Sequence, residues 1–181
     1  AASMLDEAGY PKGENGERFS FTLDIPSWAP QAHVPMAEYI QAQMAKLDIK
    51  VELRRAPDFG TWVKRISSWD YEATMNGSFN YPDPVMHRHF DCDNIKNVIW
   101  SNTQGYCDPE MDKMLDAAAI ETDFEARKKI YADIQAKAQQ DLAMIYMPQD
   151  FSATVYQDGI GNLPDSPFGG LAPLTNVYLE D

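Results

Sequence analysis

The stretch RFSFTLDIPSWAPQAHVPMAEYIQAQMAKLDIKVELRRA, residues 18–56, decides the fold of this chain. Polar and apolar residues alternate over residues 19–25, which is the period of a strand, and Pro26 ends the run. Apolar residues then recur at helical spacing, where Pro35 is tolerable only near the first turn of a helix. Residues 49–53 alternate again. A strand, a helix and a strand with short links predict a βαβ unit with parallel strands and a right-handed crossover.

Further helices and strands are predicted on both sides of this unit. Asp58 precedes apolar residues at helical spacing, and Asp108 precedes Pro109, so each aspartate marks a helix start. Thr122 and Glu125 form a capping box that predicts another helix. Weaker signals predict a helix over residues 2–8, a helix start at Pro84, strands at residues 71–78, 143–148, 152–157 and 175–180, and a loop over residues 159–170. The pattern indicates an α/β fold.

The composition narrows the classes of partner. With 181 residues the chain is long enough for one domain with a core. Its 15 basic and 28 acidic residues give a net charge of −13, which repels nucleic-acid phosphates and anionic lipid, so no nucleic-acid partner is expected. No apolar run approaches the roughly 20 residues that a membrane span needs.

The chain holds two cysteines, Cys92 and Cys107, in a segment with loop character. An even number of cysteines suits a single disulfide and an oxidising compartment, and two buried thiols are the alternative. The chain also opens in a predicted helix without a start methionine or export signal. We therefore expect it to be a piece of a longer protein.

Residues that could carry metal or catalytic chemistry are sparse. His87, His89 and the two cysteines offer zinc ligands, but positions i and i+2 of a helix point about 200° apart, so both histidines could not bind one ion. Neither GxSxG nor a glycine-rich phosphate loop occurs. A catalytic pair of carboxylates, as in glycoside hydrolysis, is an alternative that stays open because the chain is rich in acidic residues. We predict no metal site, no cofactor and no enzymatic activity.

The remaining hypothesis is a site that binds a ligand without catalysing a reaction. Ligands of open α/β sheets lie beyond the carboxyl ends of the parallel strands. The first predicted strand ends at Trp28, and the third leads into an aromatic and amide-rich segment. Aromatic walls with a few hydrogen-bonding groups suit a small molecule. The alternative is that the aromatic rings only close the end of the sheet and the asparagines serve the turn. The predicted ligand-binding residues are Trp28, Asn76, Ser78, Phe79, Asn80 and Tyr81.

Several segments, taken in their order along the chain, resemble a known family. They are LDEAGYPKG, AEYIQAQMAKLDIKVEL, WDYEATMNG, NYPDP and SNTQGYCDPEMDKMLDAAAIETDFEARKKIYADIQAKAQQDLAMIYM. Together they resemble the C-terminal lobe of the family 5 extracytoplasmic solute-binding proteins, which are ABC-importer receptors for peptides, nickel and related solutes. The match runs in order from residue 2 to about residue 156.

The resemblance implies a periplasmic or lipid-anchored receptor whose two lobes close over a solute and deliver it to a membrane permease. Residues 1–158 would be the C-terminal ligand-binding lobe, a periplasmic-binding-protein-like (type II) lobe with a mixed sheet flanked by helices. Residues 159–181 would return toward the other lobe. Cys92 and Cys107 match a disulfide of some dipeptide-binding members. The open lobe face could also pair two chains.

This sequence departs from the family pattern at the ligand site. Peptide-binding members have an aspartate at the place of Asn80, where it pairs with the α-ammonium of the ligand. Some oligopeptide binders have an arginine at the place of Thr74. A neutral amide cannot supply the charge-assisted hydrogen bond that an ammonium group favours. Either Asp83 takes that role, or the ligand lacks a free amino terminus. A peptide is therefore the first expectation, and an oligosaccharide or other uncharged solute is the alternative.

Overall fold

The computed structural model describes residues 1–77, 84, 86–147, 155–164 and 172–180. The chain divides into two compact units. Unit 1 comprises Ala1–Gly77 and Asp93–Gly105, and unit 2 comprises Ser78–Cys92 and Tyr106–Asp181. Each unit has its own buried apolar residues. The predicted boundary between a lobe and a tail at residue 158 stays a prediction.

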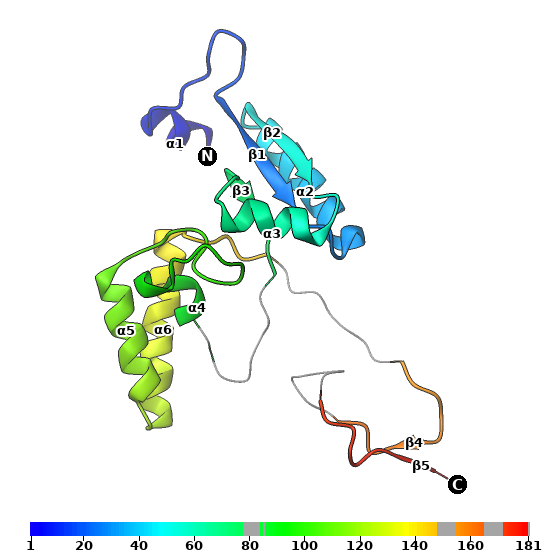
Figure 1. Cartoon of the computed structure of the whole chain (residues 1–181). Coiled ribbons are helices and arrows are strands. Elements are labelled where there is room, and N and C mark those ends of the chain that lie inside the picture. The colour runs from blue at the N-terminus through cyan, green and yellow to red at the C-terminus, as the bar shows by residue number, and fades with distance from the viewer. Residues whose placement is uncertain (78–83, 85, 148–154, 165–171, 181) are drawn as a thin grey trace. The chain divides into compact units, whose positions relative to one another are not determined.

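A parallel three-stranded sheet forms the centre of unit 1. β1 (Phe19–Ile25) lies between β2 (Ile49–Arg55) and β3 (Ala73–Thr74). β1 and β2 pair in parallel along their whole length, and α2 (Pro30–Ala45) connects them (Figure 1). The predicted βαβ unit is therefore confirmed. β3 pairs with β1 through two residues, so the third strand is shorter than its sequence pattern predicts.

Apolar side chains of β1 and β2 bury one face of this sheet against α2. Leu23, Ile25, Ile49 and Val51 of the sheet and Ala37 of α2 are each at most 6% exposed. Their burial contributes about 25 cal/mol for each Å² of apolar surface removed from water. Pro35 lies inside α2 rather than near its first turn, which differs from the sequence expectation. The buried contacts hold the helix although Pro35 lacks a backbone N–H.

On the opposite face of the sheet, Arg65 of α3 (Phe59–Ser67) reaches the side chain of Asp24 on β1. Asp58 begins this helix as predicted, because its carboxylate accepts a hydrogen bond from the backbone N–H of Thr61 at 2.7 Å. That hydrogen bond lowers the pKa of Asp58. Trp62 and Ile66 of α3 are completely buried. Residues 23–25, at the carboxyl end of β1, are buried on both faces of the sheet.

Asp24 is a completely buried acidic residue on the central strand. Nε of Arg54 on β2 lies 2.9 and 3.1 Å from its two carboxylate oxygens, and a guanidinium nitrogen of Arg65 on α3 lies 2.9 Å from one of them. Arg54 also contacts the exposed carboxylate of Asp70 at 3.5 Å. Two guanidinium groups offset the cost of burying one carboxylate. This ion cluster, Asp24 with Arg54 and Arg65, joins β1, β2 and α3.

Two helices form the core of unit 2. α5 (Pro109–Ile120) and α6 (Phe124–Asp141) pack side by side (Figure 1). Their shared core holds the completely buried side chains of Met111, Leu115 and Ile134. Asp108 begins α5 as predicted, since it accepts a hydrogen bond from the backbone N–H of Glu110 at 2.7 Å.

Lys137 of α6 ties the start of α5 to the end of α6. Its ammonium group lies 2.6 Å from Asp108 and 3.1 Å from Asp141. These contacts raise the pKa of Lys137, chiefly through Asp108. The hydrogen bond from Lys137 lowers the pKa of Asp108. Tyr106 donates to Asp141 at 2.5 Å, which is the main cause of the lowered pKa of that carboxyl group.

A disulfide joins Cys92 and Cys107, so the predicted bridge is confirmed. Cys92 follows α4 (His87–Phe90) and begins the short 3₁₀ helix η1 (Cys92–Asn94). The backbone N–H of Cys92 donates to a carboxylate oxygen of Asp112 on α5 at 3.1 Å, which anchors this end of the bridge to the helix.

Several local predictions were wrong. α6 begins after Asp123 rather than Thr122, because the Asp123 carboxylate accepts from the backbone N–H of Ala126 at 2.8 Å. A carboxylate at this position also interacts favourably with the helix dipole. α4 begins at His87 rather than at Pro84, although it carries both His87 and His89 as predicted. Residues 143–147 and 155–157 form no strand, since no neighbouring strand among the described residues pairs with them.

A small antiparallel pair lies near the end of the chain. β5 (Tyr178–Leu179) falls within the strand predicted at residues 175–180, whereas its partner β4 (Ile160–Gly161) lies where a loop was predicted. A Cβ at Gly161 would collide with the ring of Tyr178, so this pairing requires glycine there. Two-residue strands are too short to leave a periodic pattern in a sequence.

The α/β class is confirmed. Parallel and antiparallel pairing both occur, but among the described residues they belong to separate sheets rather than to one mixed sheet. The helix predicted over residues 2–8 is also present as α1 (Ala2–Glu7). Gly9, with φ of 88°, follows it in a left-handed conformation that favours glycine.

Candidate functional site

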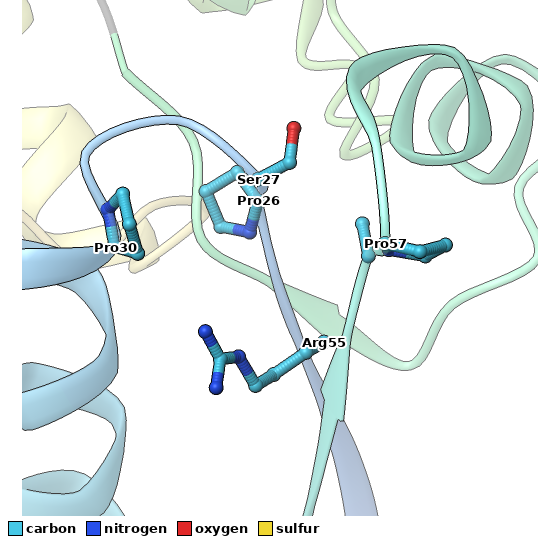
Figure 2. Close-up of a pocket in the computed structure, with 6 residues that line it drawn as sticks. Pro26, Ser27, Pro30, Arg55 and Pro57 are labelled. Atoms are coloured by element: carbon cyan, nitrogen blue, oxygen red, sulfur yellow. The ribbon is translucent and has the colours of Figure 1, made fainter.

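A hollow of about 370 Å³ lies at the carboxyl ends of β1 and β2, where α2 begins (Figure 2). Three prolines, a serine, an alanine and an arginine line it: Pro26, Ser27, Pro30, Arg55, Ala56 and Pro57. Prolines fix their own backbone angles, so the walls lose little conformational freedom when a ligand binds. The hollow occupies the edge at which open parallel sheets bind ligands.

The first turn of α2 borders this hollow. Ala29 precedes the helix in a left-handed conformation, with φ of 45° and ψ of 50°, and its side chain makes no capping hydrogen bond. Pro30 then occupies the first helical turn. Backbone N–H groups at the start of a helix carry a partial positive charge. The hollow is therefore bounded by a helix end that favours a negatively charged neighbour.

Arg55 brings a full positive charge to the same place. Its guanidinium extends toward α2 in Figure 2. The preceding residue, Arg54, points to the other face of the sheet and is held by Asp24. Within the part of the chain that the structure describes, the guanidinium of Arg55 has no ion pair or hydrogen bond.

An aromatic cluster centred on Trp28 lies at the same end of the sheet as the hollow. The ring of Trp28 packs edge-on to buried Trp62, with centroids 4.5 Å apart, and to Phe59 and His33 at 5.8 Å. Nδ1 of His33 donates to the carbonyl oxygen of Trp28 at 2.7 Å, which fixes the turn between β1 and α2. Phe59 keeps 45% of its surface exposed and continues the cluster to Trp100 at 6.2 Å. The cluster offers an apolar wall with one exposed ring.

The carboxyl end of β3 reaches this cluster. A Cβ built at Gly77 would lie 3.9 Å from Nε1 of Trp28. The sheet thus brings together Trp28 and the segment that begins at Asn76, as the prediction of neighbouring strands requires. The side-chain oxygen of Asn76 accepts a hydrogen bond from the backbone N–H of Gly77 at 2.8 Å, so this amide also serves the local turn.

The other predicted ligand-binding residues lie outside the described residues. They are Ser78, Phe79, Asn80 and Tyr81, and Asp83 lies there too. Their role in binding stays a prediction. Sequence reasoning missed Arg55 altogether, because a polar residue at the end of an alternating strand is ordinarily a solvated position. Its only signal was its place at the carboxyl end of a strand.

The residues considered for zinc do not form a thiolate site in this structure, since both cysteines are bonded to each other. Another group of possible ligands comprises His87, Asp91 and Asp116, whose ligand atoms lie within 4.8 Å of one another. Nε2 of His87 is 3.8 Å from Asp116, whose side chain is 80% exposed. Exposed carboxylates commonly lie this close together without a bound ion, so we assign no metal to these three residues.

The fold is that of an open α/β sheet, a class whose ligands lie at the carboxyl ends of the parallel strands. Residues 1–97 match the model of the bacterial extracellular solute-binding proteins, family 5 (middle region). The chain belongs to this family, as its sequence motifs predicted. It is a family of solute-binding proteins rather than enzymes. No described helix is long and apolar enough to cross a membrane.

Three known proteins illustrate what the chain is similar to. It is 27% identical over 160 residues to di/tripeptide-binding protein 3 of Pseudomonas aeruginosa, a match that covers 87% of this chain and 28% of the relative. The oligopeptide-binding protein AppA of Bacillus subtilis, solved with a nonapeptide, matches with a TM-score of 0.78 and 22% identity over 99% of this chain and 37% of AppA. AgaA of A. tumefaciens R10, solved with agropinic acid, matches with a TM-score of 0.61 and 25% identity over 76% of this chain and 27% of AgaA.

The chain is much shorter than these proteins. It spans 28% of the length of the Pseudomonas relative and 37% of AppA. The likeness to AppA, at 22% identity, concerns the fold.

Proposed function

We propose that this chain is the C-terminal ligand-binding lobe of an extracytoplasmic receptor that captures a peptide or similar small solute and delivers it to an ABC permease. The observation that carries the proposal is the carboxyl edge of the sheet, which holds the hollow at the ends of β1 and β2, and Trp28 beside the end of β3. The matched relative in Pseudomonas aeruginosa is named for binding di- and tripeptides, which supports a peptide as the first candidate. Capture requires no covalent chemistry, so no catalytic residue is needed.

The site offers two kinds of contact for such a solute. The rings of Trp28 and Phe59 supply an apolar wall, and Phe59 is already 45% exposed. The polar groups Arg55 and Ser27 lie in the adjoining hollow. An apolar wall with a few polar groups is typical of small-molecule pockets. An opposing lobe would complete the enclosure by closing over the solute.

An oligosaccharide is the second candidate. Asn80 is an amide in a segment where a peptide receptor would hold a carboxylate, and indole rings bind the apolar faces of sugars well. The substitution Asn80→Asp separates the candidates. For a peptide with a free amino terminus, the added carboxylate would preserve or tighten binding. For a neutral sugar it would weaken binding, because an unpaired carboxylate would be buried.

The disulfide supports an extracytoplasmic location. Cys92 and Cys107 are bonded, and disulfides persist in oxidising compartments such as the periplasm. The family is also described as extracellular. The net charge of −13 makes association with nucleic acid unfavourable.

Nuclear magnetic resonance of the ¹⁵N-labelled chain tests the proposal, because it detects weak binding to a half-site. The titrants are a pool of tripeptides and a pool of neutral oligosaccharides at millimolar concentration. The indole N–H of Trp28 and the amide of Gly77 should shift, whereas amides around Phe124, which is exposed on α6, should not. Absence of any selective shift at Trp28 or Gly77 with either pool would overturn the proposal.

A further inference from the structure

An asparagine followed by a glycine occurs twice in this chain, as Asn15 with Gly16 and as Asn76 with Gly77. Glycine has no side chain to shield its backbone nitrogen, so the two residues of such a pair can react with each other in water. The glycine nitrogen attacks the side-chain carbonyl carbon of the asparagine, which loses its amide nitrogen as ammonia. Both asparagines are exposed to solvent, so exposure does not distinguish the two pairs.

The turn at the first pair holds the reacting groups apart. The backbone N–H of Gly16 donates to the carbonyl oxygen of Gly13 at 3.0 Å. The side-chain oxygen of Asn15 accepts a hydrogen bond from the backbone N–H of Glu17 at 3.1 Å. Because the nitrogen and the amide are each held by another group, both must be released before they can meet.

At the second pair the reacting groups are already in contact. The backbone N–H of Gly77 donates to the side-chain oxygen of Asn76 at 2.8 Å. The nitrogen therefore lies beside the carbonyl group that it would attack, and rotation about the Cβ–Cγ bond of Asn76 turns the carbon toward it. Holding two reacting groups together in this way removes part of the entropic barrier to their reaction.

We propose that Asn76 is a site of spontaneous deamidation and that the folded chain selects it over Asn15. A base in the solvent removes the proton from the Gly77 nitrogen. That nitrogen forms a bond to Cγ of Asn76, the bond between Cγ and Nδ2 breaks, and Nδ2 takes up a proton from water and leaves as ammonia. Water then opens the cyclic imide at either of its two carbonyl groups, which gives aspartate or isoaspartate.

The product changes the carboxyl edge of the unit 1 sheet. Either form carries a new carboxylate, and isoaspartate also adds a carbon atom to the backbone between β3 and Gly77. This backbone passes Trp28, since a Cβ built at Gly77 would lie 3.9 Å from the indole nitrogen. The reaction needs no solute, so it is independent of the proposed function.

The test incubates the folded 181-residue chain in mildly alkaline buffer and follows each asparagine by peptide mapping with mass spectrometry. Fragment ions separate Asn76 from Asn80, which lies nearby in the sequence. We expect Asn76 to convert about fivefold faster than Asn15 or more, because the hydrogen bond that holds Gly16 must break first. In concentrated urea both turns are lost, and there the two rates should approach each other.

The substitution Gly77→Ala tests which nitrogen attacks. The added methyl group hinders attack by the backbone nitrogen of residue 77. The structure has room for it, because the backbone there is not left-handed and the nearest atom to a Cβ is the Trp28 nitrogen at 3.9 Å. We expect the conversion of Asn76 to slow several-fold in this variant, while Asn15 keeps its rate. An unchanged circular dichroism melt shows that the variant is folded.

Three results would overturn the inference. Conversion of Asn15 in the folded chain at the rate of Asn76 or faster would show that the two turns do not select the site. Persistence of the Asn76 amide would show that its contact with Gly77 does not lead to reaction. An unchanged rate at Asn76 in Gly77→Ala would show that another group attacks. The proposed function would survive all three, because its own test is the binding of solute.

Discussion

Replacing Asp24 by alanine tests how unit 1 is held together. The carboxylate is completely buried and accepts hydrogen bonds from Arg54 and Arg65, whose side chains are 33% and 19% exposed. Breaking a buried ion pair by removing one partner costs about 3–5 kcal/mol. The lower end applies here, because both arginines reach water and Arg54 keeps its contact with Asp70. We expect a loss of about 3 kcal/mol in the free energy of unfolding.

A urea titration followed by tryptophan fluorescence measures this loss selectively. All four tryptophans, at positions 28, 62, 69 and 100, lie in unit 1, so the signal reports on that unit. Asp70→Ala is the matched control: Asp70 also contacts Arg54 but its side chain is 65% exposed, and exposed pairs contribute about 1 kcal/mol at most. Equal losses for the two variants would refute the reasoning that burial makes the Asp24 cluster important.

Three further predictions concern unit 2. Replacing both cysteines by serine should lower the free energy of unfolding by about 3 kcal/mol, since the bridge closes a loop with a sequence separation of 15, and an unchanged denaturation midpoint would contradict this. The contact with Lys137 lowers the pKa of Asp108 in the folded chain below its ordinary value of 3.8. The contact should therefore stabilise unit 2 fully above pH 3.8, and this stabilisation should be lost as the pH falls through the lowered pKa. Circular dichroism melts should show this loss, and Lys137→Met should reduce it; the same pH dependence in that variant would refute the assignment. Ile134→Ala should cost about 2–5 kcal/mol because Ile134 is completely buried, whereas Ile120→Ala, at a position 83% exposed, should cost little; similar melts would contradict the core assignment.

Much of the fold follows from patterns that the sequence shows directly. The βαβ unit was predictable because strand and helix periods follow one another without ambiguity between residues 19 and 55. Asp58 and Asp108 were also identified as helix starts, since a short acidic side chain before a helix has a clear physical role.

Other features depend on contacts between distant segments. The alternation in β1 does not reveal that Asp24 is buried, because only the packing of α3 covers that face. Residues 143–147 have strand propensity, but a strand also needs a neighbour for its backbone groups. The choice of Asp123 over Thr122 as the helix start depends on the conformation of one turn.

The position of the candidate site was predictable from the sequence, but the positive charge of Arg55 at that position was not. Its place at the carboxyl ends of parallel strands followed from the βαβ unit, and Trp28 lies there. Arg55 could not be singled out from sequence, because its lack of an ion pair among the described residues shows only in the folded structure. Arg54 and Arg55 are adjacent in sequence, yet one is paired with a buried carboxylate and the other lines the hollow.

The most direct test of the account is a crystal structure of this chain with the solute that shifts the Trp28 indole most strongly. We expect the solute to lie at the carboxyl edge of the unit 1 sheet, in contact with the hollow at the ends of β1 and β2 and with Trp28. A solute bound on the α5–α6 helices of unit 2 instead, with the hollow at Arg55 left empty, would contradict it.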